Sequence, residues 1–262
     1  MSWLSRPFLR RLLCCGLLAW LPLAAAAATA GAAPRLLGFT ENLAPLNYEE
    51  AGRAQGFSSE LARLMAAEAG LPIEIRVLPW QRAVQTAATA AQPSQPSLLF
   101  SLTRTPEREA QYQWVGPISP RRILVYRLSA REDLQPAGLQ ALGALRVGVV
   151  RESAAARRLL QAEGLDAAQL EWALDDAANL RKLLAGRMDL IVMLDWAAAW
   201  HLRQLRLPLN TLAPALPLDV TRAYWFGLPP DCDPALVRRL QEALDRVKRD
   251  GRYERLRQRY LG

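Results

Sequence analysis

Short apolar segments that suit buried strands alternate in this chain with longer segments that suit amphipathic helices, and this alternation constrains the fold most. The first half predicts strands at 35–39, 73–77 and 98–100, with helices from Ser58 or Ser59 to Ala69 and from Pro79 through Val84. A strand–helix–strand–helix–strand order favours a largely parallel sheet with helices on its faces. Ligand sites in such sheets lie at the carboxyl ends of the strands.

A second α/β unit repeats the pattern after a break at Gly116-Pro117 and Pro120. A new strand at 123–126 follows the break, so we place a first crossing between two lobes at 118–122. The second unit then predicts strands at 146–150, 170–172 and 189–193, with helices at 154–163, 177–184 and 196–202. The aromatic run 224–226 leads back, and one last helix is expected from Pro234 to Leu261.

The N-terminal segment, residues 1–30, has the layout of a secretory signal peptide, because arginines precede an apolar run and small residues follow it. Cleavage fits both Ala28-Thr29-Ala30 and Ala30-Gly31-Ala32. Cys14 and Cys15 lie inside this segment without a lipid-attachment motif before them. Cys232 is then the remaining cysteine, so we expect an exported, periplasmic protein that is held together by its core and not by a disulfide.

Charge and composition argue against several classes of function. The net charge is +8, and removal of the three signal-segment arginines leaves +5, mixed in sign along most of the chain. No nucleic-acid reader motif accompanies the basic C-terminal helix. His201 is the only histidine, and no glycine-rich phosphate loop or GxSxG elbow is present. We therefore expect no cofactor, no metal, no nucleic acid and no enzymatic activity.

The segment 98–114, LLFSLTRTPEREAQYQW, carries the candidate binding chemistry. An apolar strand ends near the hydroxyls of Ser101 and Thr103, and Thr105 followed by Pro106 is typical of a helix start. Arg108 would lie in the first turn, where a cation opposes the helix dipole unless an anion binds there. The alternative is a surface arginine that pairs with Glu107 or Glu109.

SLTRTPERE with QYQW resembles the motif of family 3 periplasmic solute-binding proteins, the polar amino-acid receptors of ABC importers. The resemblance implies that Ser101, Thr103 and Arg108 hold a ligand carboxylate. Further landmarks follow in family order: APLNY with GF at 44–57, PWQRA at 79–83, LRVGVV at 145–150, GRMDL at 186–190 and DGRYERLRQRYLG at 250–262. The family resemblance also implies a type II periplasmic-binding fold with two hinge crossings. Lobe 1 would be residues 34–118 plus 223–262, and lobe 2 would be residues 119–222.

The remaining ligand contacts are implied less directly. Trp80 lies where the family places an aromatic that stacks on the ligand, although a core tryptophan has the same pattern. Leu43 replaces a second aromatic of the family. The family's ammonium-binding acid falls on Leu194, one residue before Asp195, which either binds an amine or caps the next helix. Ser153 keeps a hydroxyl at a helix start, after the exposed charges expected at Arg151 and Glu152.

The function expected from the sequence is capture of a small polar carboxylate, an amino acid first of all, between two lobes that close on it. The partner would be an inner-membrane ABC permease, and we expect a monomer. Two alternatives stay open: a sensory binding module without a transport role, and a periplasmic lyase of the cyclohexadienyl-dehydratase kind on the same fold.

Overall fold

The structure is a computed structural model that describes residues 35–90, 95–161 and 164–261. The predicted signal peptide lies outside these residues. These described residues form one compact unit, so the division into two lobes stays a prediction. Among the described residues, we find no helix with the length and apolarity that crossing a membrane requires.

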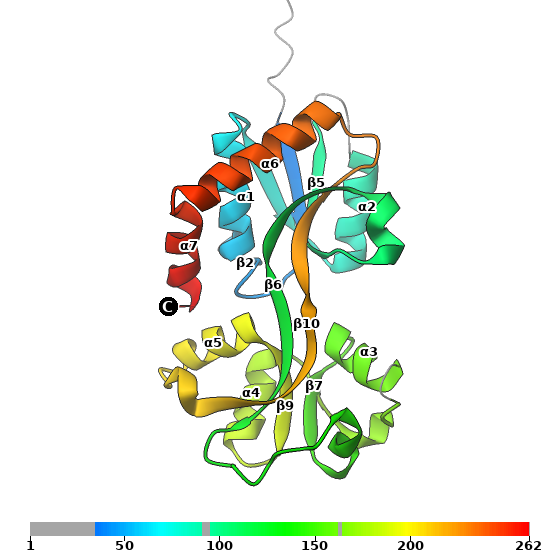
Figure 1. Cartoon of the computed structure of the whole chain (residues 1–262), viewed down its shortest axis with the longest axis vertical. Coiled ribbons are helices and arrows are strands. Elements are labelled where there is room, and N and C mark those ends of the chain that lie inside the picture. Colours follow the sequence, from blue (N-terminus) through cyan, green and yellow to red (C-terminus); the bar gives the residue numbers. More distant parts are fainter. Residues whose placement is uncertain (1–34, 91–94, 162–163, 262) are drawn as a thin grey trace, which may run out of the picture. The chain divides into compact units, whose positions relative to one another are not determined.

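One mixed sheet of eight strands organises the described chain, in the order β4-β1-β5-β10-β6-β9-β7-β8 (Figure 1). Its outer strands form two parallel groups, β4-β1-β5 and β9-β7-β8, joined through the long antiparallel pair β10 and β6. A separate hairpin pairs β2 (Tyr48–Glu50) with β3 (Arg53–Gln55). The sheet strands are β1 (Leu36–Thr40), β4 (Ile73–Val77), β5 (Ser97–Thr103), β6 (Gln113–Leu128), β7 (Val147–Val150), β8 (Leu170–Ala173), β9 (Leu190–Leu194) and β10 (Leu212–Leu228).

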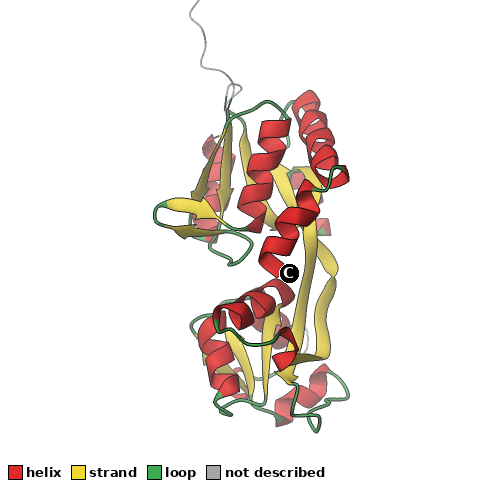
Figure 2. Ribbon diagram, turned by 90° about the vertical axis from the view of Figure 1, so that its left-hand side faces the viewer, coloured by secondary structure: helices red, strands yellow, loops and turns green. Residues whose placement is uncertain are grey.

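Helices flank the strands, as Figure 2 shows. They are α1 (Phe57–Glu68), α2 (Trp80–Ala90), α3 (Ala154–Gln161), α4 (Asp176–Leu184), α5 (Asp195–Gln204), α6 (Pro234–Arg249) and α7 (Arg252–Leu261). Short 3₁₀ segments lie between them: η1 (Pro106–Gln111), η2 (Leu139–Ala144), η3 (Ala167–Gln169) and η4 (Leu209–Thr211). The predicted strands and helices are present in the predicted order, most with boundaries within two residues, but the hairpin of β2 and β3 and the strand β10 were not predicted.

The core lies on both faces of the sheet. Leu36, Leu98 and Phe100 belong to the large cluster beneath α1 and α6. Their neighbours along the same strands point to the other face, since side chains alternate along a strand. Leu37, Phe39 and Leu99 join Ala83 and Ala87 of α2 in a second cluster. Leu102 also belongs to this cluster, because the irregularity at Ser101 reverses the alternation after Phe100. Burial on both faces explains why these strands read as continuous apolar runs.

The chain break predicted between Gly116 and Pro120 is wrong, because β6 runs unbroken from Gln113 to Leu128. The crossing between lobes at 118–122 stays a prediction. Ser119 pairs with Tyr224 and the next pair is Val115 with Phe226, so 116–118 lie where the register shifts. Proline is tolerated at such irregularities because no ladder bond requires its missing N–H. Gly116-Pro117 therefore interrupts the pairing and not the strand, while Pro120 keeps its register opposite Ala223.

Two helix predictions also need correction. The C-terminal helix is two helices, since Gly251 adopts φ +81° and ends α6. The predicted serine cap of α1 is absent: the helix starts after Gly56, whose φ of 104° suits glycine, and Ser58 and Ser59 are buried. Within the described residues, neither of these two hydroxyls has a hydrogen-bond partner.

Candidate functional site

Three parallel strands bring candidate residues to one edge of the sheet. β1, β4 and β5 are parallel neighbours, so their carboxyl ends lie side by side. Glu41 follows β1, Trp80 follows β4 after two residues, and Arg108 follows β5. Strand order therefore assembles residues that are up to 67 positions apart in sequence.

The segment that carries Arg108 is η1, a 3₁₀ helix of six residues without a buried side chain. The Thr105 side chain does not cap it. Thr105 instead hydrogen-bonds the Glu107 carboxylate, which lowers the pKa of that carboxyl. The Arg108 N–H donates to the Thr105 carbonyl at 3.0 Å. The predicted helix start is present, but as 3₁₀ structure and without the threonine cap.

Arg108 presents its guanidinium to a pocket. Nη1 donates to the Thr103 carbonyl at 3.2 Å, and Cζ lies 5.9 Å from the centre of the Trp80 ring. Within the described parts of the chain, no carboxylate lies within 4.0 Å of the Arg108 guanidinium. The predicted alternative, pairing with Glu107 or Glu109, is wrong, because Thr105 bonds Glu107 and Arg104 bonds Glu109.

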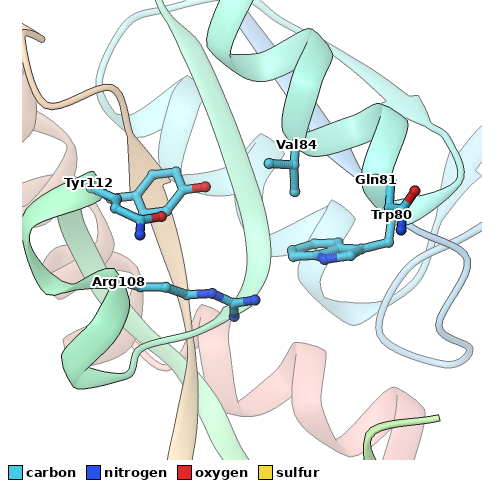
Figure 3. Close-up of a pocket in the computed structure, with 6 residues that line it drawn as sticks. Trp80, Gln81, Val84, Arg108 and Tyr112 are labelled. Carbon is cyan, nitrogen blue, oxygen red and sulfur yellow. The ribbon is translucent and has the colours of Figure 1, made fainter. Parts of the chain in front are cut away.

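The pocket beside Arg108 has a volume of about 280 Å³. Figure 3 shows Trp80, Gln81 and Val84 on the α2 side and Arg108 and Tyr112 on the other. The full set of lining residues is Trp80, Gln81, Val84, Arg108, Gln111 and Tyr112. Burial raises the pKa of the Tyr112 hydroxyl, so it stays a neutral hydrogen-bonding group. The lining thus combines aromatic walls, amides and one cation.

Ser101 lies in β5 and is only 4% exposed. It adopts φ +56° where β5 shifts register against β10, which is rare for a residue with a Cβ. Its hydroxyl donates to Asn47 Oδ1, and the Asn47 amide donates to the Glu41 carbonyl. Asn47 is fully buried and fixes the loop after β1 against β5. Sequence reasoning did not single out Asn47, although its place in a turn-rich loop after a strand was a usable signal.

Glu41 is a second residue that the sequence interpretation missed. Burial raises the pKa of its carboxyl, and the charges of Arg157 and Arg108 act in the opposite direction. Glu41 and Arg108 thus interact electrostatically at the same strand ends. This combination offers one group to a carboxylate and another to an ammonium.

Ser153 and Asp195 lie in the other parallel group, after β7 and β9. The Ser153 hydroxyl accepts from the Ala156 N–H at 3.1 Å and so caps α3. Asp195 begins α5, where Oδ1 accepts from the Trp196 N–H at 2.8 Å and Oδ2 lies 4.0 Å from Arg122 Nε. Burial raises the pKa of the Asp195 carboxyl. Leu194 is buried in β9.

The other chemistry-bearing side chains are scattered. In the described ranges no group of three or more His, Cys, Asp or Glu side chains lies close enough to hold a metal ion. Cys232 is a half-buried thiol whose pKa burial raises, with Asp233 and Asp231 adding to the effect. Burial lowers the pKa of His201 on α5. The candidate site is therefore the edge that carries Glu41, Trp80 and Arg108.

Comparison with solved structures supports the fold. An ancestral cationic amino acid solute-binding protein matches with a TM-score of 0.70 and 18% identity, over 87% of this chain and 95% of that one. A histidine kinase sensor domain with similarity to periplasmic binding proteins matches at 0.65 and 22% identity, over 87% and 96%. The arginine-, lysine-, histidine-binding protein ArtJ from Geobacillus stearothermophilus matches at 0.62 and 18% identity, over 87% and 95%.

The sequence comparison covers nearly the whole described chain. No curated protein sequence matches it. The family model of the bacterial extracellular solute-binding proteins, family 3, matches residues 36–262, which include every strand of the sheet and the candidate site. The chain therefore belongs to the family 3 bacterial extracellular solute-binding proteins.

Proposed function

We propose that this chain is an exported receptor that captures a small polar carboxylate, an amino acid first of all, and delivers it to an inner-membrane ABC permease. The environment of the Arg108 guanidinium is the observation that carries the proposal. The guanidinium faces a pocket beside an aromatic ring, and in the described residues no carboxylate neutralises it. A ligand carboxylate would take up this cation in a bidentate pair.

The other roles follow from the contacts around Arg108. Trp80 packs against the small apolar cluster and lines the pocket, so its free surface would contact the ligand body. Thr103 would add a hydroxyl beside the arginine. Ser101 would act mainly by holding the loop after β1, because its hydroxyl proton is already donated to Asn47.

The ammonium of the ligand has two candidate partners, Glu41 and Asp195. Both carboxyls have a pKa raised by burial, so a cation brought by the ligand would stabilise their ionised forms. Ser153 caps α3 and would contribute to the ligand site through that helix end. We retain 34–118 with 223–262 and 119–222 as the lobes that close on the ligand.

A ligand-sensing module is the second candidate, because a histidine kinase sensor domain is among the similar folds. Importer and sensor both start with capture of a ligand, so the first experiment addresses capture alone. The mature chain, freed of carried-over ligand, would be unfolded thermally with L-amino acids, dicarboxylates, opines and small peptides. A ligand at a hundred times its Kd adds about 2.7 kcal/mol, which is a rise of roughly 5 to 10 °C in Tm for a chain of this size.

Arg108→Ala is the decisive variant and Arg82→Ala is its control. Arg82 is an exposed arginine on α2, the helix that also carries Trp80. We expect ligand to raise the Tm of the wild type and of Arg82→Ala but not that of Arg108→Ala. An equal rise in all three proteins would remove Arg108 from the site. Each ligand would also be incubated with the protein and followed by chromatography. Chemical conversion of the ligand would favour the lyase alternative.

A further inference from the structure

Inside η1, Gln111 Nε2 donates to the Glu107 carbonyl at 2.8 Å, a bond between exposed residues that does not include Arg108. None of the six residues of η1 is buried, and no side chain caps its N-terminus. A 3₁₀ helix has poorer hydrogen-bond geometry than an α-helix and is seldom stable alone. The segment must therefore be held by residues outside it.

Arg104, just before η1, provides such a tether. Its Nε donates to Glu109 Oε2 at 2.8 Å and its Nη2 donates to Oε1 at 2.5 Å, which is a bidentate pair with a residue inside η1. Trp114 Nε1 donates to the Glu109 carbonyl at 3.2 Å. Glu109, the direct neighbour of Arg108, is thus fixed by both its side chain and its backbone.

Two tryptophans hold Arg104 itself. Arg104 Cζ lies 4.7 Å from the ring centre of Trp225 and 5.4 Å from that of Trp114. The two rings are 6.5 Å apart in an edge-to-face arrangement. Trp114 belongs to β6 and Trp225 to β10, whose backbones are paired within the sheet. A guanidinium between two aromatic rings gains cation–π attraction while it keeps its carboxylate partner.

We propose that Arg104 is a positioning residue for the ligand site. Together with Glu109, Trp114 and Trp225, which we call the Arg104 clamp, it anchors η1 to the central strands and so fixes the direction in which Arg108 presents its guanidinium. The two arginines of the motif thus have different roles: Arg104 holds the segment and Arg108 meets the ligand. The second role rests on the proposed function, whereas the first does not.

The test uses hydrogen–deuterium exchange of the mature protein without ligand, so that it does not depend on ligand identity. We expect Arg104→Met to speed exchange at residues 106–111 by about tenfold, while exchange in β5 stays unchanged. Glu109→Gln should have the same effect, and the double variant should add little, since both changes break one pair. Arg104→Lys should restore part of the protection because it keeps the cation between the rings.

Arg257→Met is the matched control. Arg257 also forms a bidentate pair, with Glu254 at 2.9 and 2.7 Å, but it lies in α7. The Arg257→Met substitution should leave hydrogen–deuterium exchange at residues 106–111 unchanged. Unaltered exchange in Arg104→Met, or the same increase in Arg257→Met, would refute the clamp.

A second measurement separates the clamp from the proposed function. L-Arginine and L-glutamine would each be titrated into the wild type and into Arg104→Met, and the Kd of each complex would be measured. A rise of about tenfold in Kd without a matching fall in Tm supports positioning of Arg108. Unchanged Kd for a ligand that does bind overturns the link from η1 to the ligand. If neither amino acid binds the wild type, these probes count against the proposed function, and the exchange result alone decides the clamp.

Discussion

The ion pair between Arg121 and Asp219 gives the sharpest prediction about the two long strands. Arg121 lies in β6 and Asp219 in β10, and Nη1 donates to Oδ2 at 2.5 Å. Their side chains are only 7% and 10% exposed. Arg121→Met would leave the Asp219 carboxylate buried without its main partner, which typically destabilises a protein by about 3 to 5 kcal/mol. Arg222 Nη1, at 4.0 Å from the same oxygen, favours the lower end of that range.

Urea unfolding followed by circular dichroism measures this loss. With a slope of about 3 kcal/mol per molar urea, a loss of about 3 kcal/mol lowers the midpoint by about 1 M. Arg121→Met with Asp219→Leu removes both charges, so its free energy of unfolding should return to within about 1 kcal/mol of the wild type. Arg131→Met breaks an exposed pair with Asp133 and should cost at most about 1 kcal/mol. Equal small losses in both single variants would refute the reasoning.

Other predictions concern helix starts and glycines. Burial raises the pKa of Asp176 in α4 to about 6, so the folded state holds this proton more tightly than the unfolded state, and its ionisation destabilises the fold as pH rises from about 4 to 6. Asp176→Asn should therefore raise the free energy of unfolding by about 1 to 2 kcal/mol at pH 7 and hardly at pH 4 in urea titrations. Asp175→Ala removes the side-chain oxygen that accepts from the Ala178 N–H at the start of α4. It should lower the free energy of unfolding by about 1 kcal/mol at pH 7, which calorimetry would detect. Gly116→Ala places a Cβ 2.7 Å from the Trp225 ring at φ +156° and should lower stability by about 2 kcal/mol, more than Gly52→Ala, where nothing lies within 4 Å.

Much of the fold could be predicted because its signals are local. Apolar runs such as 98–100 and turn residues such as Gly70 mark boundaries that depend on a few neighbouring residues. The length of β6 could not be predicted in this way. Pro117 is compatible with the strand because β10 shifts register beside it, and that pairing joins residues about a hundred positions apart.

The candidate site was predictable where one motif carries the chemistry. Arg108 stands out because a cation near a helix start requires a reason, and the structure leaves its guanidinium facing a pocket. Asn47 and Tyr112 were not singled out, since their roles depend on tertiary contacts with β5 and α2. Arg104 lies four residues before Arg108 in the same motif. Its role was not predictable, because it depends on the positions of Glu109, Trp114 and Trp225 in the folded chain.

The charges at the strand ends argue for an amino acid over a dicarboxylate. Arg108 offers a cation without a carboxylate partner among the described residues, while the Glu41 carboxyl interacts with that arginine and has a pKa raised by burial. A dicarboxylate would place a second negative charge near Glu41 and raise its pKa further. A zwitterion would pair its carboxylate with Arg108 and bring an ammonium that would stabilise the ionised Glu41. Because each charge of the zwitterion would meet the opposite charge, one ligand would neutralise both groups, and this argument for the proposed ligand is the same for transport and for sensing.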